Sequence, residues 1–497
     1  MRSRRLWPLL LAGAAFFSVF KAHRSFYGGE LRVLFNSTAP LSDYEITSPA
    51  YSQDYFFLEN VFSPLVEYSS GDEIVSGLAE SYRWDGGDAV FRMRTGVRTI
   101  DGRVIDARDA ELSLKRAFIL GGRDFDVLRV PLCGPRPLRS LSDPCPGLKV
   151  LDGGQVLVMG FGEKKPLLFH LLTNITYGVV PRGALDPVTL KIKDYRNTSG
   201  PYYVASDLGG GAFVLAANPG HYRYSERMPL RVRLVPLTKV ITNEEALAML
   251  SEGKVDYIVN NLVRNPADKL RFAAAMPGYS ASLTQPIRLV YLVFTKKGIE
   301  RLSMAERFFI ARKARELYLS GRELCEAPYQ IFRMEGALSK AQLSEIKDRL
   351  EGASEYVIKR RLSALWTKMY FFRKEDDFGA WLPGLSDAAD GKTEPDFFFN
   401  SGDVGFQDDI GLLSYYLKRR FFDMTEEEKD GFFRKYESLK DKKERALLLR
   451  DLQYRAISRG RVLPVALMPY SSLARAPWKF QFPSMCAGDN LWRLRRD

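Results

Sequence analysis

The chain has little of what catalysis and metal binding usually require, since its 497 residues include only three histidines and four cysteines. No Cys-x-x-Cys pair and no His-Glu-x-x-His motif occurs, which argues against a zinc ribbon, a thioredoxin-like redox centre and a zincin. The sequence also lacks a Gly-x-Ser-x-Gly nucleophile motif, a Walker phosphate loop and a dinucleotide fingerprint after a strand. We therefore expect no catalytic residue, no metal site, no cofactor and no enzymatic activity.

Long apolar runs are missing from the body of the chain, which excludes a polytopic membrane protein. With 46% hydrophobic and 27% charged residues, the composition is that of a folded globular protein. At roughly 100–200 residues per domain, the length predicts about two to four lobes. The net charge is +13, but acids and bases are interleaved and the basic clusters are short, so we expect no nucleic-acid partner.

The N-terminus has the pattern of an export signal. Arg2, Arg4 and Arg5 precede an apolar run over residues 6–20, which has the length of a signal-peptide core and is short for a spanning helix. The match to a cleavage site is poor, because cleavage after Ala22 would place Phe20 three residues before the cut. We predict export, with residues 1–22 serving as a signal peptide or as an uncleaved N-terminal anchor.

Two of the cysteines lie close together in sequence. Cys133 and Cys145 flank a loop that contains Pro135, Pro137 and Pro144. Because an exported protein can form disulfides, a local bridge between them is a reasonable hypothesis. The alternative is that all four cysteines are free thiols.

Hydrophobic patterning predicts a mixed α/β chain. Alternation or continuous apolar character predicts strands at 31–35, 89–93, 156–159, 212–217, 230–234, 255–259 and 462–468. Periodicity and capping residues predict a helix after Asp106 and others at 244–252, 305–320 and 442–458, and Thr425 with Glu428 forms a capping box. No linker is long enough to separate independent modules, so we expect lobes that are interleaved in sequence.

Several segments occur in an order that matches a known family. They read ENVFSPLVE at 59–67, GLAESYRW at 77–84, VFRMRTGV at 90–97, DG at 101–102 with DARD at 106–109, and NTSGPY at 197–202. Further segments at 250–256 and 452–470 continue the series. Together they resemble the family 5 extracellular solute-binding proteins, which are the oligopeptide- and dipeptide-binding proteins of ABC importers.

This resemblance implies a periplasmic-binding-protein-like fold of class C, with two sheet-and-helix lobes that close on a cleft and an inserted α+β domain. Lobe I would comprise 30–49, 176–285 and 468–497, the inserted domain 50–175, and lobe II 286–467. The implied function is that of a monomeric periplasmic or otherwise exported protein. It would capture a peptide or small solute and deliver it to an inner-membrane ABC permease.

The resemblance also suggests ligand-binding residues. Family peptide binders hold the peptide ammonium with an aspartate of the second lobe, and the nearest stretch here is 386–399. Asp390 is the first candidate for this anchor and Asp396 the second, while an exposed acidic loop is the alternative. The aromatic residues Tyr51, Tyr55 and Phe57 are candidates for lining the cleft, although a core role is equally compatible with their positions.

Two other functions fit the same sequence. The first is binding of a non-peptide solute such as a metal chelate, a sugar or an opine, although the scarcity of histidine argues against direct nickel ligation. The second is an envelope scaffold or chaperone-like protein that kept the fold and lost ligand binding. A cleft lined by aromatic residues with one buried carboxylate would favour the peptide binder.

Overall fold

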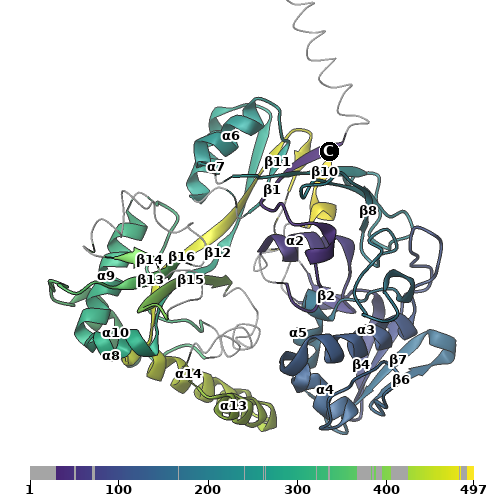
Figure 1. Ribbon diagram of the computed structural model, residues 1–497, viewed down its shortest axis with the longest axis horizontal. Coiled ribbons are helices and arrows are strands. Elements are labelled where there is room, and N and C mark those ends of the chain that lie inside the picture. The colour runs from purple at the N-terminus through teal and green to yellow at the C-terminus, as the bar shows by residue number, and fades with distance from the viewer. Residues whose placement is uncertain are drawn as a thin grey trace, which may run out of the picture.

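The computed structural model describes residues 30–496 apart from 50–51, 70–72, 166, 240, 261, 263–264, 321, 334–335, 367–381, 383–384, 388–393, 404–421, 423, 481, 483–487 and 489. This part of the chain forms two bodies that are joined by long strands in the upper half of the view (Figure 1). We call the body on the right lobe I with its inserted domain, and the body on the left lobe II.

One ten-stranded sheet runs through both bodies, in the order β14-β13-β15-β12-β16-β11-β1-β10-β9-β8. Its lobe I strands are β1 (Leu31–Phe35), β8 (Tyr202–Asp207), β9 (Phe213–Ala217), β10 (Arg231–Pro236) and β11 (Tyr257–Ile258). Its lobe II strands are β13 (Ser363–Trp366), β14 (Ser386–Asp387) and β15 (Phe397–Asp403). The prediction of an α/β fold with two sheet-containing lobes is confirmed, and the sheet is continuous between them.

Two long strands, β12 (Tyr279–Phe294) and β16 (Val462–Arg475), connect the lobes. They pair antiparallel from Tyr279 opposite Arg475 to Val293 opposite Val462. The register shifts on both sides of Pro286, which faces Pro469, and again between Val290 and Tyr291. Because proline has no backbone N–H, the proline pair weakens the ladder midway along the crossing. On β12, the packing changes from a lobe I cluster at Ala281 to the lobe II cluster at Leu289.

β1 lies in the core of lobe I, because all of its residues except Arg32 are apolar and buried. β1 is parallel to both β10 and β11. Beside it, the Arg32 guanidinium donates two hydrogen bonds to the buried Asp256 carboxylate, both at 2.9 Å. These bonds raise the pKa of Arg32 and fix β1 against the end of β11.

The lobe I helices are α2 (Ser52–Val61), α6 (Asn243–Ser251) and α7 (Pro266–Ala275). In α2, Phe56, Phe57 and Val61 are buried in the lobe I core. This places α2 in lobe I, whereas the sequence assigned residues from 50 onward to the inserted domain. The inserted domain begins instead at an antiparallel bridge between Ser63 and Val179, through which the chain leaves lobe I and returns.

The inserted domain is an α+β unit with its own core. Its four-stranded sheet has the order β4 (Ala79–Asp85), β5 (Asp88–Met93), β7 (Val156–Gly160) and β6 (Leu148–Leu151). Strands β2 (Val66–Tyr68) and β3 (Ile74–Ser76) form a separate hairpin, and the helices are α3 (Ala107–Leu120), α4 (Asp126–Cys133) and α5 (Leu168–Leu172). As expected, Asp106 caps α3, and it forms a reciprocal capping box with Asp109.

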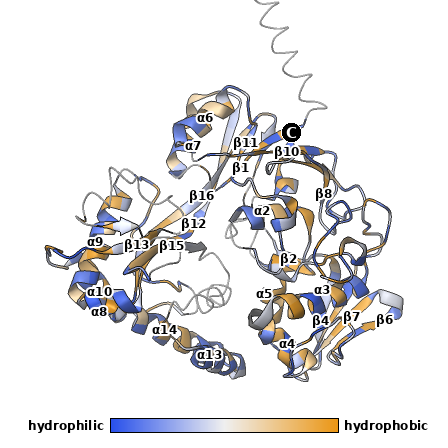
Figure 2. Cartoon of the chain, in the orientation of Figure 1, coloured by the Kyte–Doolittle hydropathy of each residue, from blue (hydrophilic) through white to orange (hydrophobic). Residues whose placement is uncertain are grey.

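Lobe II holds α8 (Lys296–Arg301), α9 (Met304–Leu319), α10 (Lys340–Glu351), α13 (Glu426–Ser438) and α14 (Lys442–Ser458). The capping box of Thr425 with Glu428 begins α13, and the predicted bounds of α14 are confirmed. Most of α13 is hydrophilic (Figure 2). Its buried residues include Phe432 and Tyr436, so one apolar stripe joins the lobe II core.

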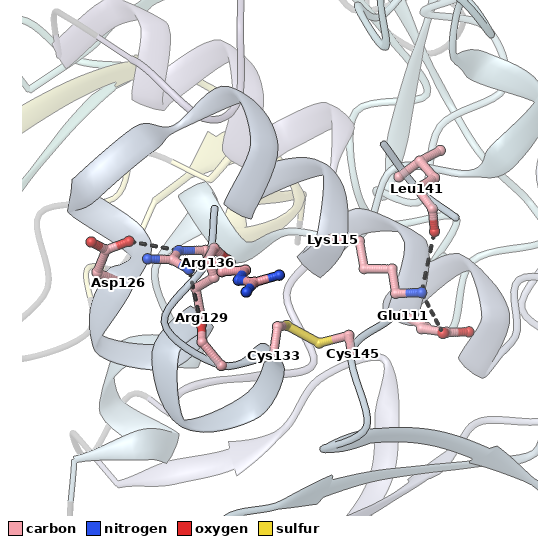
Figure 3. Close-up of a disulfide and its surroundings, with 9 residues drawn as sticks. Glu111, Lys115, Asp126, Arg129, Cys133, Arg136, Leu141 and Cys145 are labelled. Atoms are coloured by element: carbon pink, nitrogen blue, oxygen red, sulfur yellow. Dashed lines mark hydrogen bonds and ion pairs between the residues drawn. A yellow bond between two sulfur atoms is a disulfide. The ribbon is translucent and has the colours of Figure 1, made fainter. Parts of the chain in front are cut away.

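The predicted bridge between Cys133 and Cys145 is confirmed (Figure 3). It joins the end of α4 to the segment before β6. Nearby, the Arg129 side chain bonds Asp126 at 2.7 Å and the carbonyl of Arg136 at 2.8 Å, while Lys115 bonds the carbonyl of Leu141 at 3.2 Å. The bridge and these bonds together hold the proline-rich loop against α3 and α4.

Replacing Cys145 with alanine should lower the free energy of unfolding by about 3 kcal/mol, because opening so short a loop restores chain entropy to the unfolded state. Urea unfolding of wild type and variant without reductant measures the difference. Cys325→Ala is the control, since Cys325 is a free thiol. Equal midpoints for wild type and Cys145→Ala would contradict the prediction.

Candidate functional site

The junction of the lobes is where β12, β15 and β16 meet. The Arg288 guanidinium lies over the Tyr470 ring, 5.4 Å from its centroid, and donates to the Ser401 hydroxyl at 3.4 Å. Arg288 and Tyr470 are both half-buried. A guanidinium beside an aromatic ring can bind a carboxylate and an apolar group side by side. The junction therefore presents a cationic and an aromatic group close to the paired prolines Pro286 and Pro469.

A buried lysine fixes the lobe I end of the junction. Lys269 of α7 is fully buried, and its ammonium donates to the carbonyls of Val259, at 2.8 Å, and Ser471. These carbonyls follow β11 and lie within β16, respectively. Lys269 thus ties a helix of lobe I to the crossing strand, one residue after Tyr470.

The serines next to this point are not fully satisfied. Ser471 and Ser472 are each 1% exposed, and their hydroxyls have no hydrogen-bond partner among the described residues. A buried hydroxyl without a partner costs about 1–3 kcal/mol. Such groups are rare in folded proteins and are more frequent at functional sites than elsewhere. The same feature occurs away from the crossing at the Tyr202 hydroxyl of lobe I, which also has no hydrogen-bond partner among the described residues.

A second polar cluster joins the inserted domain to lobe I. Tyr222 donates to the Glu67 carboxylate at 3.0 Å, and Arg223 forms an ion pair with the same carboxylate. Arg94 lies over the Tyr222 ring at 4.5 Å, and Arg223 lies over the Trp492 ring at 3.6 Å. Each charge in this cluster has a partner within the protein, so the cluster is a structural clamp.

The buried His221 belongs to the same clamp. Its Nδ1 accepts the backbone N–H of Arg223 at 3.2 Å, so its Nε2 carries the proton and donates to the Ser63 hydroxyl at 3.2 Å. Burial, with Arg223 and Arg94 nearby, holds the pKa of His221 well below its usual range. His221 is thus a neutral structural histidine, which agrees with the absence of a catalytic histidine motif.

The structure gives Asp396 a structural environment. Its carboxylate is fully buried, accepts two hydrogen bonds from Arg301 at 2.7 and 2.9 Å, and accepts the backbone N–H of Ser363 at 2.7 Å. Its carbonyl lies so near Gly298 that a Cβ there would come within 1.9 Å. These contacts fix β15, β13 and α8 together, and they occupy the carboxylate that was the second candidate for the ligand anchor.

The remaining candidates have different outcomes. Phe57 is fully buried among the rings of Tyr44, Tyr195 and Phe213. It therefore has the core role that was the alternative to lining the cleft. Tyr55 is half-buried and packs against the same core. Asp390 and Tyr51 lie outside the described residues.

Sequence reasoning missed Arg288, Tyr470 and Lys269. Arg288 had one usable signal, because it lies two residues after Pro286 and directly precedes the apolar run 289–294. Lys269 had none, since a lysine in an amphipathic helix normally points to solvent. No group of three or more metal-ligating side chains occurs in the described ranges. Within those ranges, no helix combines the length and the apolar character that a membrane span requires.

Comparison with solved structures identifies the fold. The oligopeptide-binding protein OppAIV of Borrelia burgdorferi superposes with a TM-score of 0.72 at 16% identity, over 94% of this chain and 99% of that one. The chain has the same fold as this periplasmic solute-binding protein. No protein-family model and no curated protein sequence matches it.

Two further proteins share this solute-binding fold. DppA of Helicobacter pylori, in complex with the peptide STSA, has a TM-score of 0.70 at 13% identity, over 94% of this chain and 98% of that one. AgaA of A. tumefaciens R10, in complex with agropinic acid, has a TM-score of 0.69 at 15% identity, over 94% and 99%. The fold thus accommodates both peptide and non-peptide ligands.

Replacing Lys269 with methionine should destabilise this solute-binding fold by about 1–3 kcal/mol, because it removes the donor to two buried carbonyls. Urea unfolding followed by circular dichroism measures the change. Lys239→Met is the matched control, since the Lys239 side chain is 73% exposed. A loss no larger than that of the control would show that Lys269 is not a structural tie.

The stability of the solute-binding fold should depend on His221 below about pH 6.5. Because the folded-state pKa of His221 is lowered, the unfolded chain takes up a proton that the folded chain does not. Stability from this residue is present above pH 6.5 and falls by about 1.4 kcal/mol per pH unit below it. His221→Gln should therefore lose less stability than wild type between pH 6.5 and 5. Parallel pH profiles from urea unfolding would contradict this assignment.

Proposed function

We propose that the protein is an exported solute-binding protein that captures a peptide or peptide-like solute and delivers it to an ABC permease of the inner membrane. The observation that carries the proposal is the likeness to OppAIV, DppA and AgaA over 94% of the chain. All three are named as binding proteins, and DppA holds a peptide. The order of sequence motifs points to the same function independently.

The junction geometry supports capture between the lobes. In the described residues the chain passes between the two bodies only through β12 and β16, and the ladder between them is irregular at Pro286 and Pro469. Two connecting strands with a weak point allow the lobes to rotate while each core stays intact. Arg288 and Tyr470 lie beside this point, where a bound solute would meet both lobes.

We place the proposed ligand anchor at Asp390. An α-ammonium in a closed site requires an acceptor of full negative charge, because an unpaired buried charge is costly. Asp396 is engaged by Arg301 and Ser363, which leaves Asp390 as the better candidate in the stretch 386–399. Tyr55 of α2, which is half-buried, is a second proposed ligand contact.

Agropinic acid in AgaA supports a second candidate function, the binding of a non-peptide anionic solute. The specific observation is the Arg288 guanidinium at the junction, which suits a carboxylate from either class of ligand. The two candidates differ in whether the ligand carries an amino terminus.

Calorimetry with a mixed peptide pool and its N-acetylated form separates the candidates. We expect the pool to bind wild type and the acetylated pool to bind weakly. Asp390→Asn should lower peptide affinity by tens- to thousands-fold, which corresponds to about 2–5 kcal/mol for a buried ammonium left unpaired. Asp396→Asn, as matched control, should reduce stability and leave the preference for a free amino terminus unchanged.

Mass spectrometry of solutes that co-purify with the exported protein is an independent test of the ligand class. A peptide supports the leading function, and an organic acid without an amino terminus supports the second. Equal binding of acetylated and free peptides would contradict the ammonium anchor. The absence of any bound solute, together with no binding in calorimetry, would overturn both candidates in favour of a scaffold without a ligand.

A further inference from the structure

The inserted domain touches lobe II at a place other than the crossing strands. Leu167, which immediately precedes α5, is 6% exposed and belongs to the hydrophobic cluster of lobe II. Every other buried member of that cluster lies between residues 289 and 468. Figure 1 shows α5 and α13 on the facing sides of the two bodies, below the crossing strands. A leucine of one body is therefore buried in the core of the other.

Charged residues surround this contact from both sides. Glu437, in the last turn of α13, is half-buried. Burial raises the pKa of its carboxyl, while Lys165 of the inserted domain lowers it and Glu163 raises it. Lys165 forms an ion pair with Glu163 at 3.0 Å, and Lys440 attracts the Glu163 carboxylate from lobe II. Lysines and carboxylates thus face each other from both bodies.

The contact is sensitive to lobe movement. The inserted domain is bound to lobe I by Arg116, which is 1% exposed and whose guanidinium donates to both oxygens of Glu45, at 2.7 and 2.6 Å. Arg182 adds a bond of 3.0 Å to Asp109. The inserted domain therefore moves with lobe I, so rotation about the crossing strands separates Leu167 from lobe II.

We propose that Leu167, with Glu163 and Lys165, forms a latch against Glu437 and Lys440 that holds the lobes together in the absence of ligand. Leu167 supplies apolar burial, which is non-directional, and the charges of both signs around it influence how the two surfaces align. The latch sets how often the lobes open, and hence how fast a solute enters and leaves. It goes beyond the proposed function because it does not depend on which solute is bound.

Small-angle X-ray scattering and hydrogen exchange of the full chain test the latch without any ligand. The protein is unfolded and refolded first, which removes co-purifying solute. Leu167→Asp should increase the radius of gyration and speed amide exchange in α13 by about ten- to a hundredfold, since the burial of one leucine is lost. Leu151→Asp is the matched control, because Leu151 is in the same domain and is 48% exposed.

A charge swap makes the test independent of Leu167. Glu437→Lys should open the lobes, and Lys165→Glu combined with Glu437→Lys should restore part of the wild-type radius and exchange rate. Glu444→Lys, at an exposed position in the first turn of α14, is the control for charge alone. An unchanged radius and unchanged α13 exchange in both Leu167→Asp and Glu437→Lys would overturn the latch. Circular dichroism checks that each variant is folded. If Leu167→Asp does not fold, the result of the charge swap decides the question.

Discussion

The antiparallel pairing of β12 with β16 is the constraint on which the rest of the structure depends. These two strands belong to the cores of both lobes at once, so their register fixes where each lobe lies relative to the other. The pairing is interrupted where Pro286 faces Pro469, since neither proline can donate to the ladder. A long ladder with a few irregular points keeps both cores attached while leaving places where the strands can bend.

The polar interactions around this constraint are unevenly distributed. Between lobe I and the inserted domain, Arg116 pairs with Glu45 and Tyr222 donates to Glu67. At the crossing, the hydroxyls of Ser471 and Ser472 are buried without partners among the described residues. The pairs of Arg116 with Glu45 and Tyr222 with Glu67 resist separation of the inserted domain from lobe I, because breaking a pair leaves both partners unsatisfied.

Asp396 illustrates how burial decides between roles that a sequence leaves open. A carboxylate in an acidic stretch of lobe II is compatible with a ligand anchor or with a structural ion pair. Its contacts with Arg301 and Ser363 assign it to the second, because a carboxylate already satisfied by a guanidinium and a backbone N–H gains little from a ligand ammonium. The same principle gives Lys269 a structural role that its position in a helix did not suggest.

Local physical signals in the sequence determined much of the architecture. Continuous apolar runs predicted β1 and the start of β16, capping residues predicted the starts of α3 and α13, and the short spacing of Cys133 and Cys145 pointed to a bridge. The motif order pointed to the solute-binding fold. The sequence did not reveal that β16 continues to Arg475, because the polar Ser471 and Ser472 interrupt its apolar run.

Only the tertiary structure decided which side chains meet. Tyr55 and Phe57 lie two residues apart in an aromatic stretch, yet Phe57 is in the core and Tyr55 is half-buried, because the helix turns them to different faces. The contact of Leu167 with lobe II joins segments far apart in sequence, and nothing local specifies it. Local propensity acts over a few residues, whereas burial and charge pairing depend on the packing of whole lobes.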